Sequence, residues 1–213
     1  MTGFEFHALA LPAALLLLIT SMVLVVVNDW RLSLLALAVQ YIGVFSMVAI
    51  HWPLVMALTK LVAGWISVAV LGMALSSAGT SSDERPAPAG YATNWKYISS
   101  VLSAWIFRVL AAAMIALVVV SMAPPIAGWI SNIQLEQVVG ALILIGLGLL
   151  HLGFTAVPFR IILALLTVLS GFEIIYAGVE KSTLVAGLLA GVNLGLAMVG
   201  AYLLVTSVGE EQA

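Results

Sequence analysis

Seven long apolar stretches, separated by short polar breaks, constrain this chain more than any other feature of its sequence. A helix needs about 20 mostly apolar residues to cross the hydrocarbon core of a bilayer. The 213 residues are 64% hydrophobic and only 8% charged, against about 25% charged residues in a typical soluble domain. The sequence therefore predicts an all-α fold, a polytopic transmembrane helix bundle that forms a single domain over residues 1–213. The expected spans are 8–27, 32–50, 53–75, 97–122, 138–157, 161–179 and 183–205.

The breaks between these spans contain polar and turn-forming residues. The longest break, 76–96, is rich in Ser, Thr, Gly and Pro, and such a composition cannot bury enough surface to fold alone. Pro124 and Pro125 predict the end of the fourth span, because proline lacks the N–H that a helix requires. We expect residues 126–137 to lie along the membrane interface and the polar tail 209–213 to fray.

The positions of Lys and Arg predict how the chain is oriented. Seven spans place the two termini on opposite sides of the membrane. The breaks on one side contain Arg31, Arg85, Lys96 and Arg160, whereas those on the other contain only Lys181. Because cytoplasmic loops carry the excess of Lys and Arg, we expect the N-terminus outside and the C-terminus and the loop 76–96 in the cytoplasm.

Composition also excludes several classes of site. The chain has no cysteine, which rules out disulfides, iron-sulfur ligation and thiolate metal sites. Its three histidines, His7, His51 and His151, show no spacing typical of a haem or metal site. The net charge of −2 is too small to indicate a nucleic-acid partner, and no nucleotide-binding or hydrolase motif is present. Catalytic chemistry would have to lie within the membrane or on a partner.

Three ionisable side chains lie inside the expected spans: Lys60, Arg108 and Glu173. A charge within hydrocarbon costs about 2.5 kcal/mol or more on insertion scales and marks a functional candidate. In one interpretation the two cations reach the interface or pair with a carboxylate to orient helices. In the other, Glu173 and Lys60 belong to a proton relay, because burial favours the neutral form of both groups. The polar companions in the spans are His151, Gln40, Asn193 and Tyr176.

Arg108 and His151 have simpler interpretations. A guanidinium group does not lose its proton, so we expect Arg108 to be a structural counter-ion or a lipid-headgroup contact. A lone imidazole such as His151 is more typical of helix packing than of ligand binding. Gly187, Gly191 and Gly195 are spaced at i, i+4 and i+8, a pattern typical of close helix contact, so this face is expected to pack against a neighbouring helix, either of this chain or of another subunit.

Several segments resemble the small membrane subunits of complex I and related assemblies. Trp30-Arg31-Leu32-Ser33, followed by Ala38-Val39-Gln40-Tyr41, is similar to the second-span opening of hydrogenase-4 component E (HyfE), and Ala57-Leu58-Thr59-Lys60-Leu61-Val62 is similar to its third span. Gly171-Phe172-Glu173-Ile174-Ile175 resembles the glutamate-bearing second span of the NuoK subunit of complex I, to which the MrpC subunit of multisubunit antiporters is related. The likeness to HyfE covers most of the chain, and the likeness to NuoK about the last 70 residues.

This resemblance implies a membrane subunit of a complex I-like or membrane-bound hydrogenase-like redox complex. It implies that Glu173 belongs to a hydrophilic axis along which protons move. NuoK carries a second acid on its last span, whereas the matching position here is about Gly191, with Asn193 as the polar residue nearby. Redox centres such as iron-sulfur clusters are expected on partner subunits and not in this chain, and a structural lipid is compatible with it.

The resemblance also implies partners and a location. The expected partners are the lipid bilayer and other membrane subunits, antiporter-like ones included, and the expected location is the bacterial inner membrane. Two alternatives stay open. One is a scaffold subunit that conducts no ions, and the other is a small independent secondary transporter, a class that commonly shows inverted repeats and broken helices.

Overall fold

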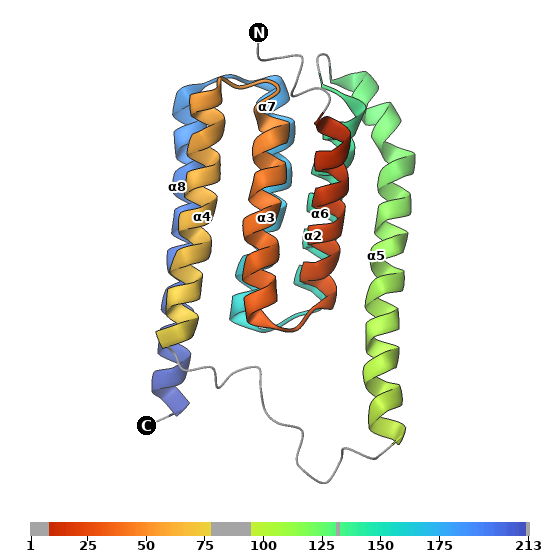
Figure 1. Cartoon of the computed structure of the whole chain (residues 1–213), viewed down its shortest axis with the longest axis vertical. Helices are drawn as coiled ribbons and strands as arrows, with labels where there is room; N and C mark the ends of the chain where they lie inside the picture. The colour runs from red at the N-terminus through yellow and green to blue at the C-terminus, as the bar shows by residue number, and fades with distance from the viewer. Residues whose placement is uncertain (1–8, 78–94, 131–132, 212–213) are drawn as a thin grey trace.

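A computed structural model describes residues 9–77, 95–130 and 133–211 of the chain. These residues form seven helices and no strand, which confirms the predicted all-α bundle (Figure 1). Six of the helices are long and apolar enough to cross a membrane, and α2 is shorter, with 17 residues. The helices are α2 (Ala10–Val26), α3 (Trp30–Val48), α4 (Leu54–Ser77), α5 (Trp95–Trp129), α6 (Leu135–Gly153), α7 (Pro158–Val179) and α8 (Thr183–Glu211).

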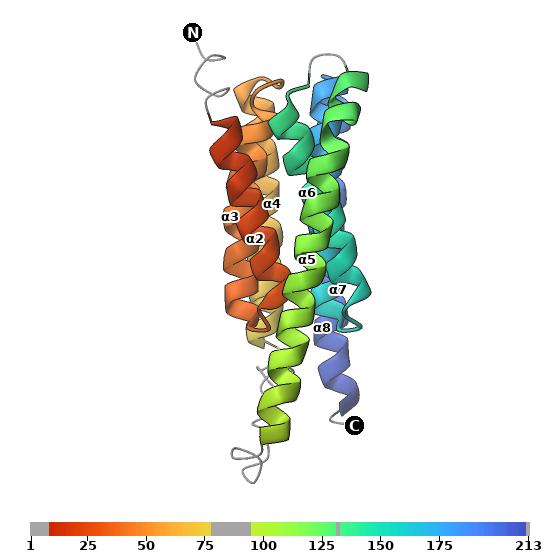
Figure 2. The same ribbon diagram turned by 90° about the vertical axis from the view of Figure 1, so that its right-hand side faces the viewer.

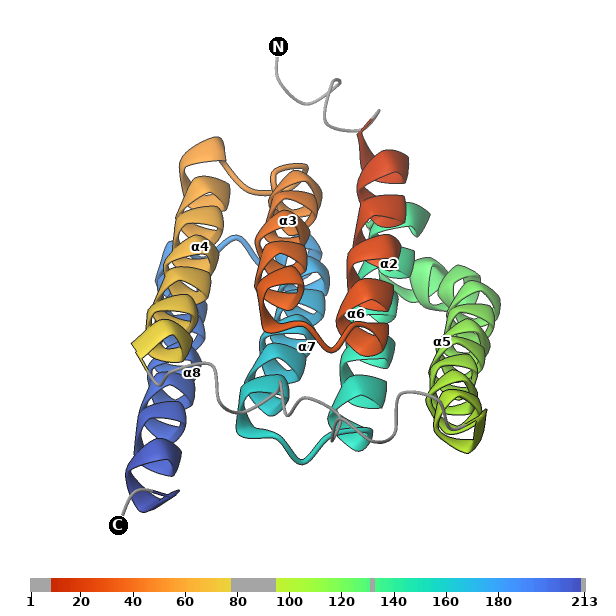
Figure 3. The ribbon, with the colours of Figure 1, turned by 60° about the horizontal axis from the view of Figure 1, so that its bottom comes forward.

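The helices are arranged in two layers of three, with α5 at one side. Helices α2, α3 and α4 form one layer and pack against α6, α7 and α8, respectively, in the other (Figures 1 and 2). We call the end that contains His51 the His51 end, which is uppermost in Figure 1, and the opposite end the Asn28 end. Between α4 and α6 in the chain, α5 returns from the Asn28 end to the His51 end along the side of the bundle, so both layers run in the same direction (Figures 1 and 3). Helices α2 and α6 lead away from the His51 end, α3 and α7 return to it, and α4 and α8 lead away again.

Local signals at the helix ends follow the sequence closely. The Asp29 carboxylate accepts a hydrogen bond from the Arg31 backbone N–H at 2.8 Å and so caps the start of α3, a role for which Asp is well suited. Pro158 occupies the first turn of α7, where its missing N–H has no cost. At the His51 end, the Trp52 Nε1–H donates to the Glu180 carbonyl at 2.9 Å and ties the turn between α3 and α4 to the turn between α7 and α8.

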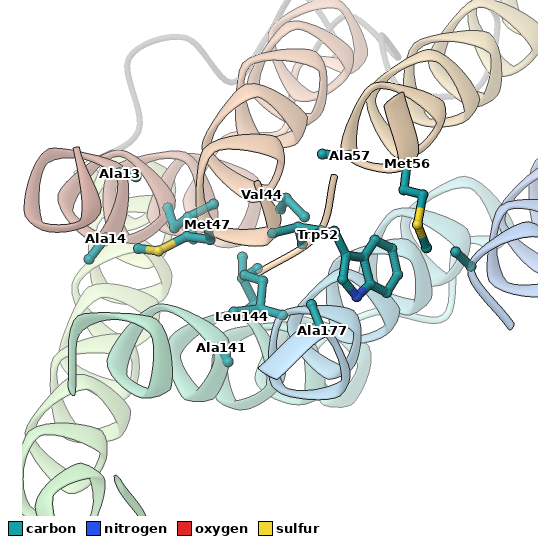
Figure 4. Close-up of a cluster of buried hydrophobic side chains, with 14 residues drawn as sticks. Ala13, Ala14, Val44, Met47, Trp52, Met56, Ala57, Ala141, Leu144 and Ala177 are labelled. Atoms are coloured by element: carbon teal, nitrogen blue, oxygen red, sulfur yellow. The ribbon is translucent and has the colours of Figure 1, made fainter. Parts of the chain in front are cut away.

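The apolar core lies between the layers and depends on close helix approach. Near the His51 end it includes Met47, Trp52 and Leu144, which come from both layers (Figure 4). The approach of α7 to α6 depends on Gly171, since a Cβ there would lie 2.6 Å from the Ala141 carbonyl oxygen. Small residues therefore set the spacing of the second layer, as they commonly do between membrane helices.

Two expectations about helix ends are wrong. Helix α5 does not stop at Met122 but continues through Pro124 and Pro125 to Trp129, bending toward α6 over its last turns (Figure 3). Both prolines face outward, and buried Ala123 holds this turn against the bundle. Membrane helices tolerate such prolines, because neighbouring groups and local bending accommodate the freed backbone carbonyls. The predicted interfacial segment at 126–137 is thus helical through Trp129.

The polar tail also differs from expectation, because α8 stays helical through Glu211 instead of fraying from residue 209. The hydrogen bonds of a helix that already has many turns favour its continuation. Residues 78–94, which make up most of the predicted loop 76–96, lie outside the described residues, as do 1–8 with His7, 131–132 and 212–213.

Candidate functional site

Glu173 lies on the face of α7 that meets the first layer. It is 1% exposed, and its carboxylate forms an ion pair with the Lys60 ammonium group of α4, which is 4% exposed. Lys60 therefore does not extend its side chain to an interface, which was one interpretation of the sequence. The structure instead brings together the two residues that the sequence singled out as relay candidates.

Asn193 of α8 completes the first set of contacts to the carboxylate. Its amide Nδ2 donates to Glu173 Oε1 at 3.2 Å, while Lys60 contacts the other oxygen, Oε2. The Ser67 hydroxyl of α4 donates to the Ala63 carbonyl at 2.9 Å and lies 3.3 Å from the Asn193 carbonyl. Side chains from three helices and both layers thus meet at one buried carboxylate, with Asn193 on the span where the NuoK resemblance places a second acid. We call Lys60, Glu173 and Asn193 the acid cluster.

An aromatic residue covers the cationic member of this cluster. The Lys60 ammonium nitrogen lies 5.1 Å from the centre of the Tyr41 ring, within the range of a cation–π contact. The ring can approach α4 because residue 64 is glycine, and a Cβ at that position would overlap the Tyr41 ring. Gln40 is also buried, and neither its amide nitrogen nor its amide oxygen has a hydrogen-bond partner among the described residues.

The depth of the acid cluster follows from helix geometry. Lys60 is six residues from the start of α4, and Glu173 is six residues from the end of α7. At 1.5 Å per residue, both lie about 9 Å below the His51 end of the bundle. The ion pair is therefore nearer to the His51 end than to the Asn28 end, and most of the apolar length of the bundle lies between the pair and the Asn28 end.

This arrangement can hold and exchange a proton. In a dry interior the effective dielectric constant is low, so the two groups interact strongly. A proton taken up by the carboxylate removes the attraction that holds Lys60, and a proton lost from the ammonium leaves Glu173 without its counter-charge. The protonation states of such a closely interacting pair are coupled and belong to the pair as a whole.

The other companions do not join the acid cluster. The Tyr176 ring stacks on Phe172 with centroids 6.0 Å apart and is half-buried on another face of α7. Arg108 and His151 lie at the opposite, Asn28 end, where Arg108 Nη1 donates to Asn28 Oδ1 at 3.0 Å. Among the residues that the structure describes, no group of three His, Asp or Glu side chains lies close enough together to hold a metal ion.

A scan against protein-family models, a search of curated proteins and a search of solved structures each found no match to this chain. The resemblance to HyfE and NuoK therefore stays a prediction. What the structure shows is an integral membrane helix bundle with a buried acid cluster between its two layers.

Two residues of the site were missed in the sequence, Tyr41 as the cover of Lys60 and Ser67 beside Asn193. A signal for them existed. Lys60, Gly64 and Ser67 are spaced at i, i+4 and i+7 and so share one face of a helix, and a lysine followed on its own face by a glycine and a serine indicates a face that packs closely against protein. The role of Tyr41 could not be read in this way, because it depends on how α3 lies against α4.

Proposed function

We propose that this chain is a membrane subunit of a complex I-like or membrane-bound hydrogenase-like redox complex and contributes to proton or ion translocation, or to its coupling, through Glu173. The single observation that supports this most is the buried Lys60–Glu173 ion pair between the two helix layers. Removing two charges from water costs several kcal/mol each, and their attraction often fails to compensate for this. A pair that persists at this depth is explained by function more readily than by stability.

In this mechanism the chain binds no redox cofactor. Redox chemistry on partner subunits changes the electric field near the acid cluster, and Glu173 responds by taking up or releasing a proton. Because Lys60 and Glu173 come from different layers, the change in charge also alters the attraction between the layers. Proton exchange at one carboxylate can thus be coupled to a movement of helices α4 and α7.

The outer surface of α8 supports the proposal that the chain is one subunit of a larger assembly. A Cβ placed on Gly187, Gly191 or Gly195 would meet no atom within 4 Å among the described residues. The small-residue face therefore points away from the bundle, where an antiporter-like membrane subunit would pack against it. The proposed location is the bacterial inner membrane, with the N-terminus outside and the C-terminus in the cytoplasm.

The test replaces the acid without changing its shape. In native membranes that carry the assembly, Glu173→Gln should reduce redox-driven ion translocation at least about tenfold, the loss typical of a displaced proton-transfer group. Glu180→Gln is the matched control, because Glu180 is an exposed acid at the end of the same helix. Equal and negligible effects of both variants would leave Glu173 as a packing residue in a scaffold subunit.

A second function is favoured by one observation. The two layers run in the same direction and are joined by a single crossing helix, and some transporters are built from such parallel repeats with their site at the interface. Purification separates the two proposals. Co-purification with antiporter-like subunits and an iron-sulfur or nickel protein supports the complex, whereas a chain that runs alone and transports ions in liposomes would be an independent transporter.

A further inference from the structure

A second group of charged and polar side chains converges at the Asn28 end of the bundle, far from the acid cluster. Arg108 comes from α5, His151 from α6 and Arg160 from α7. Arg108 Nη1 donates to the Asn28 side-chain oxygen at 3.0 Å, and Arg160 Nη2 donates to the Asn28 carbonyl at 3.0 Å. Two guanidinium groups from different helices are thus held against one residue of the turn between α2 and α3. We call Asn28, Arg108 and Arg160 the arginine site.

Packing fixes both arginines in place. The neighbouring Phe107 ring lies against Phe154 at the end of α6, with centroids 5.7 Å apart, so the position of Arg108 relative to α6 is set. Arg160 is almost fully buried, while Arg108 is partly exposed. The described residues place no carboxylate within ion-pair distance of Arg108. A fixed guanidinium group with donors left over is suited to an anion from outside the protein.

The position of the arginine site indicates which anion this is. Arg108 lies at the level where α2 and α6 end, because it contacts Asn28 just after α2 and its neighbour Phe107 contacts Phe154 just after α6. In a bilayer that covers the apolar helices α2 and α6, phospholipid headgroups would lie near this level, and basic pockets between membrane helices bind anionic headgroups. We infer that the arginine site binds the phosphate group of an anionic phospholipid, with Arg108 as the contact that reaches the lipid.

The surface next to Arg108 suits the acyl chain of such a lipid. Ala116 follows Arg108 on α5 at i+8 and, together with Leu18 and Val120, helps to line an apolar groove of about 350 Å³. Ala116 lies about 12 Å from Arg108 along the helix axis at 1.5 Å per residue, within the thickness of one leaflet, about 15 Å. Glu136 lines the far end of this groove, and its charge would repel an anionic headgroup that entered from there.

The experiment measures thermal stabilisation of the purified full-length chain by added lipid in detergent. Phosphatidylglycerol should raise the midpoint of unfolding more than phosphatidylcholine does, because binding to the folded state stabilises it. Arg108→Gln should weaken the apparent affinity for phosphatidylglycerol about tenfold, the loss of one charge-assisted contact. Arg31→Gln is the control, since Arg31 is an exposed arginine at the same end that lies over the Trp30 ring, and it should bind like wild type.

Each alternative outcome of this experiment is decisive. Equal stabilisation by the two lipids, or an Arg108→Gln variant that binds phosphatidylglycerol like wild type, would overturn the inference. Inorganic phosphate alone should give no shift, and a shift equal to that of the lipid would make this a site for free phosphate instead. If Arg108→Gln fails to fold, Arg108→Lys takes its place. Lysine keeps the positive charge but lacks the planar guanidinium group, so this variant should bind phosphatidylglycerol more weakly than wild type. None of these results bears on Glu173.

Discussion

The acid cluster and the arginine site lie at opposite ends of the same bundle and use charge in different ways. In the acid cluster a lysine and a glutamate are fully buried and pair with each other across the two layers. In the arginine site two guanidinium groups of like charge, Arg160 buried and Arg108 partly exposed, share a neutral asparagine. The first set of charges is closed within the chain, whereas in the second the partly exposed Arg108 has donors that can reach a molecule outside it.

The comparison shows that depth decides what a charge can do in a membrane protein. Far from water an unpaired charge is costly, so a buried carboxylate requires a counter-charge or a proton. At the interface the same charge remains hydrated and can bind a headgroup at little cost. Substitutions in the acid cluster should therefore have large effects on stability and coupling, while those in the arginine site should act mainly through lipid.

Removal of Lys60 should have the largest effect. Lys60→Met leaves Glu173 without its counter-charge, and breaking a buried ion pair in this way costs about 3–5 kcal/mol. The measurement is unfolding of the purified chain by increasing SDS in mixed micelles. The double variant Lys60→Met/Glu173→Gln should recover most of the loss, because no buried charge remains. If Lys60→Met alone lowers the free energy of unfolding by less than the double variant does, Glu173 does not depend on Lys60 as its counter-charge.

Asn193→Leu should also destabilise the bundle, by less than Lys60→Met. It removes the donor to Glu173 Oε1, and a hydrogen bond of this kind within a membrane protein contributes about 1–2 kcal/mol. The same unfolding measurement checks it. In the Glu173→Gln background the effect should shrink, since the acceptor is no longer charged. An undiminished effect there would mean that Asn193 acts by packing alone.

Gly64→Ala tests the contact between Tyr41 and the acid cluster. The added methyl group would overlap the Tyr41 ring, and such overpacking typically costs about 1–3 kcal/mol. Gly187→Ala is its control, because that glycine faces open space and alanine is the better helix former. We expect the unfolding transition to fall for the first variant and to stay or rise for the second. Equal shifts would show that Tyr41 does not limit the approach of α3 to α4.

Arg108→Gln should have the smallest effect on the stability of lipid-free protein. Its hydrogen bond to Asn28 is exposed, and exposed polar contacts of this kind contribute about 0–1 kcal/mol. The lipid-free unfolding midpoint should thus move little, even though the response to phosphatidylglycerol changes. If Arg108→Gln lowered the stability of the lipid-free protein as much as Lys60→Met does, the arginine site would contribute to folding in the same way as the acid cluster, and the contrast between the two sites would be wrong.

The sequence predicted the helices better than it predicted their contacts. Long apolar stretches specify membrane helices directly, because the bilayer leaves the backbone few alternatives. Glu173 and Lys60 could be singled out because charges are rare at that depth. Their pairing could not be predicted, since it depends on how the layers stack. The continuation of α5 past Pro124 was missed for a related reason: the packing of Ala123 against the bundle outweighs the local preference for a break.

The most direct test of the central claim is to observe the proton on Glu173 by infrared difference spectroscopy of the active assembly during turnover. We predict a carboxylic-acid carbonyl band that appears or disappears with turnover, is absent in Glu173→Gln and is retained in Glu180→Gln. If Glu173 stays ionised throughout turnover and no such band is lost in Glu173→Gln, the acid cluster is a static ion pair, and the proposed role in ion translocation is wrong.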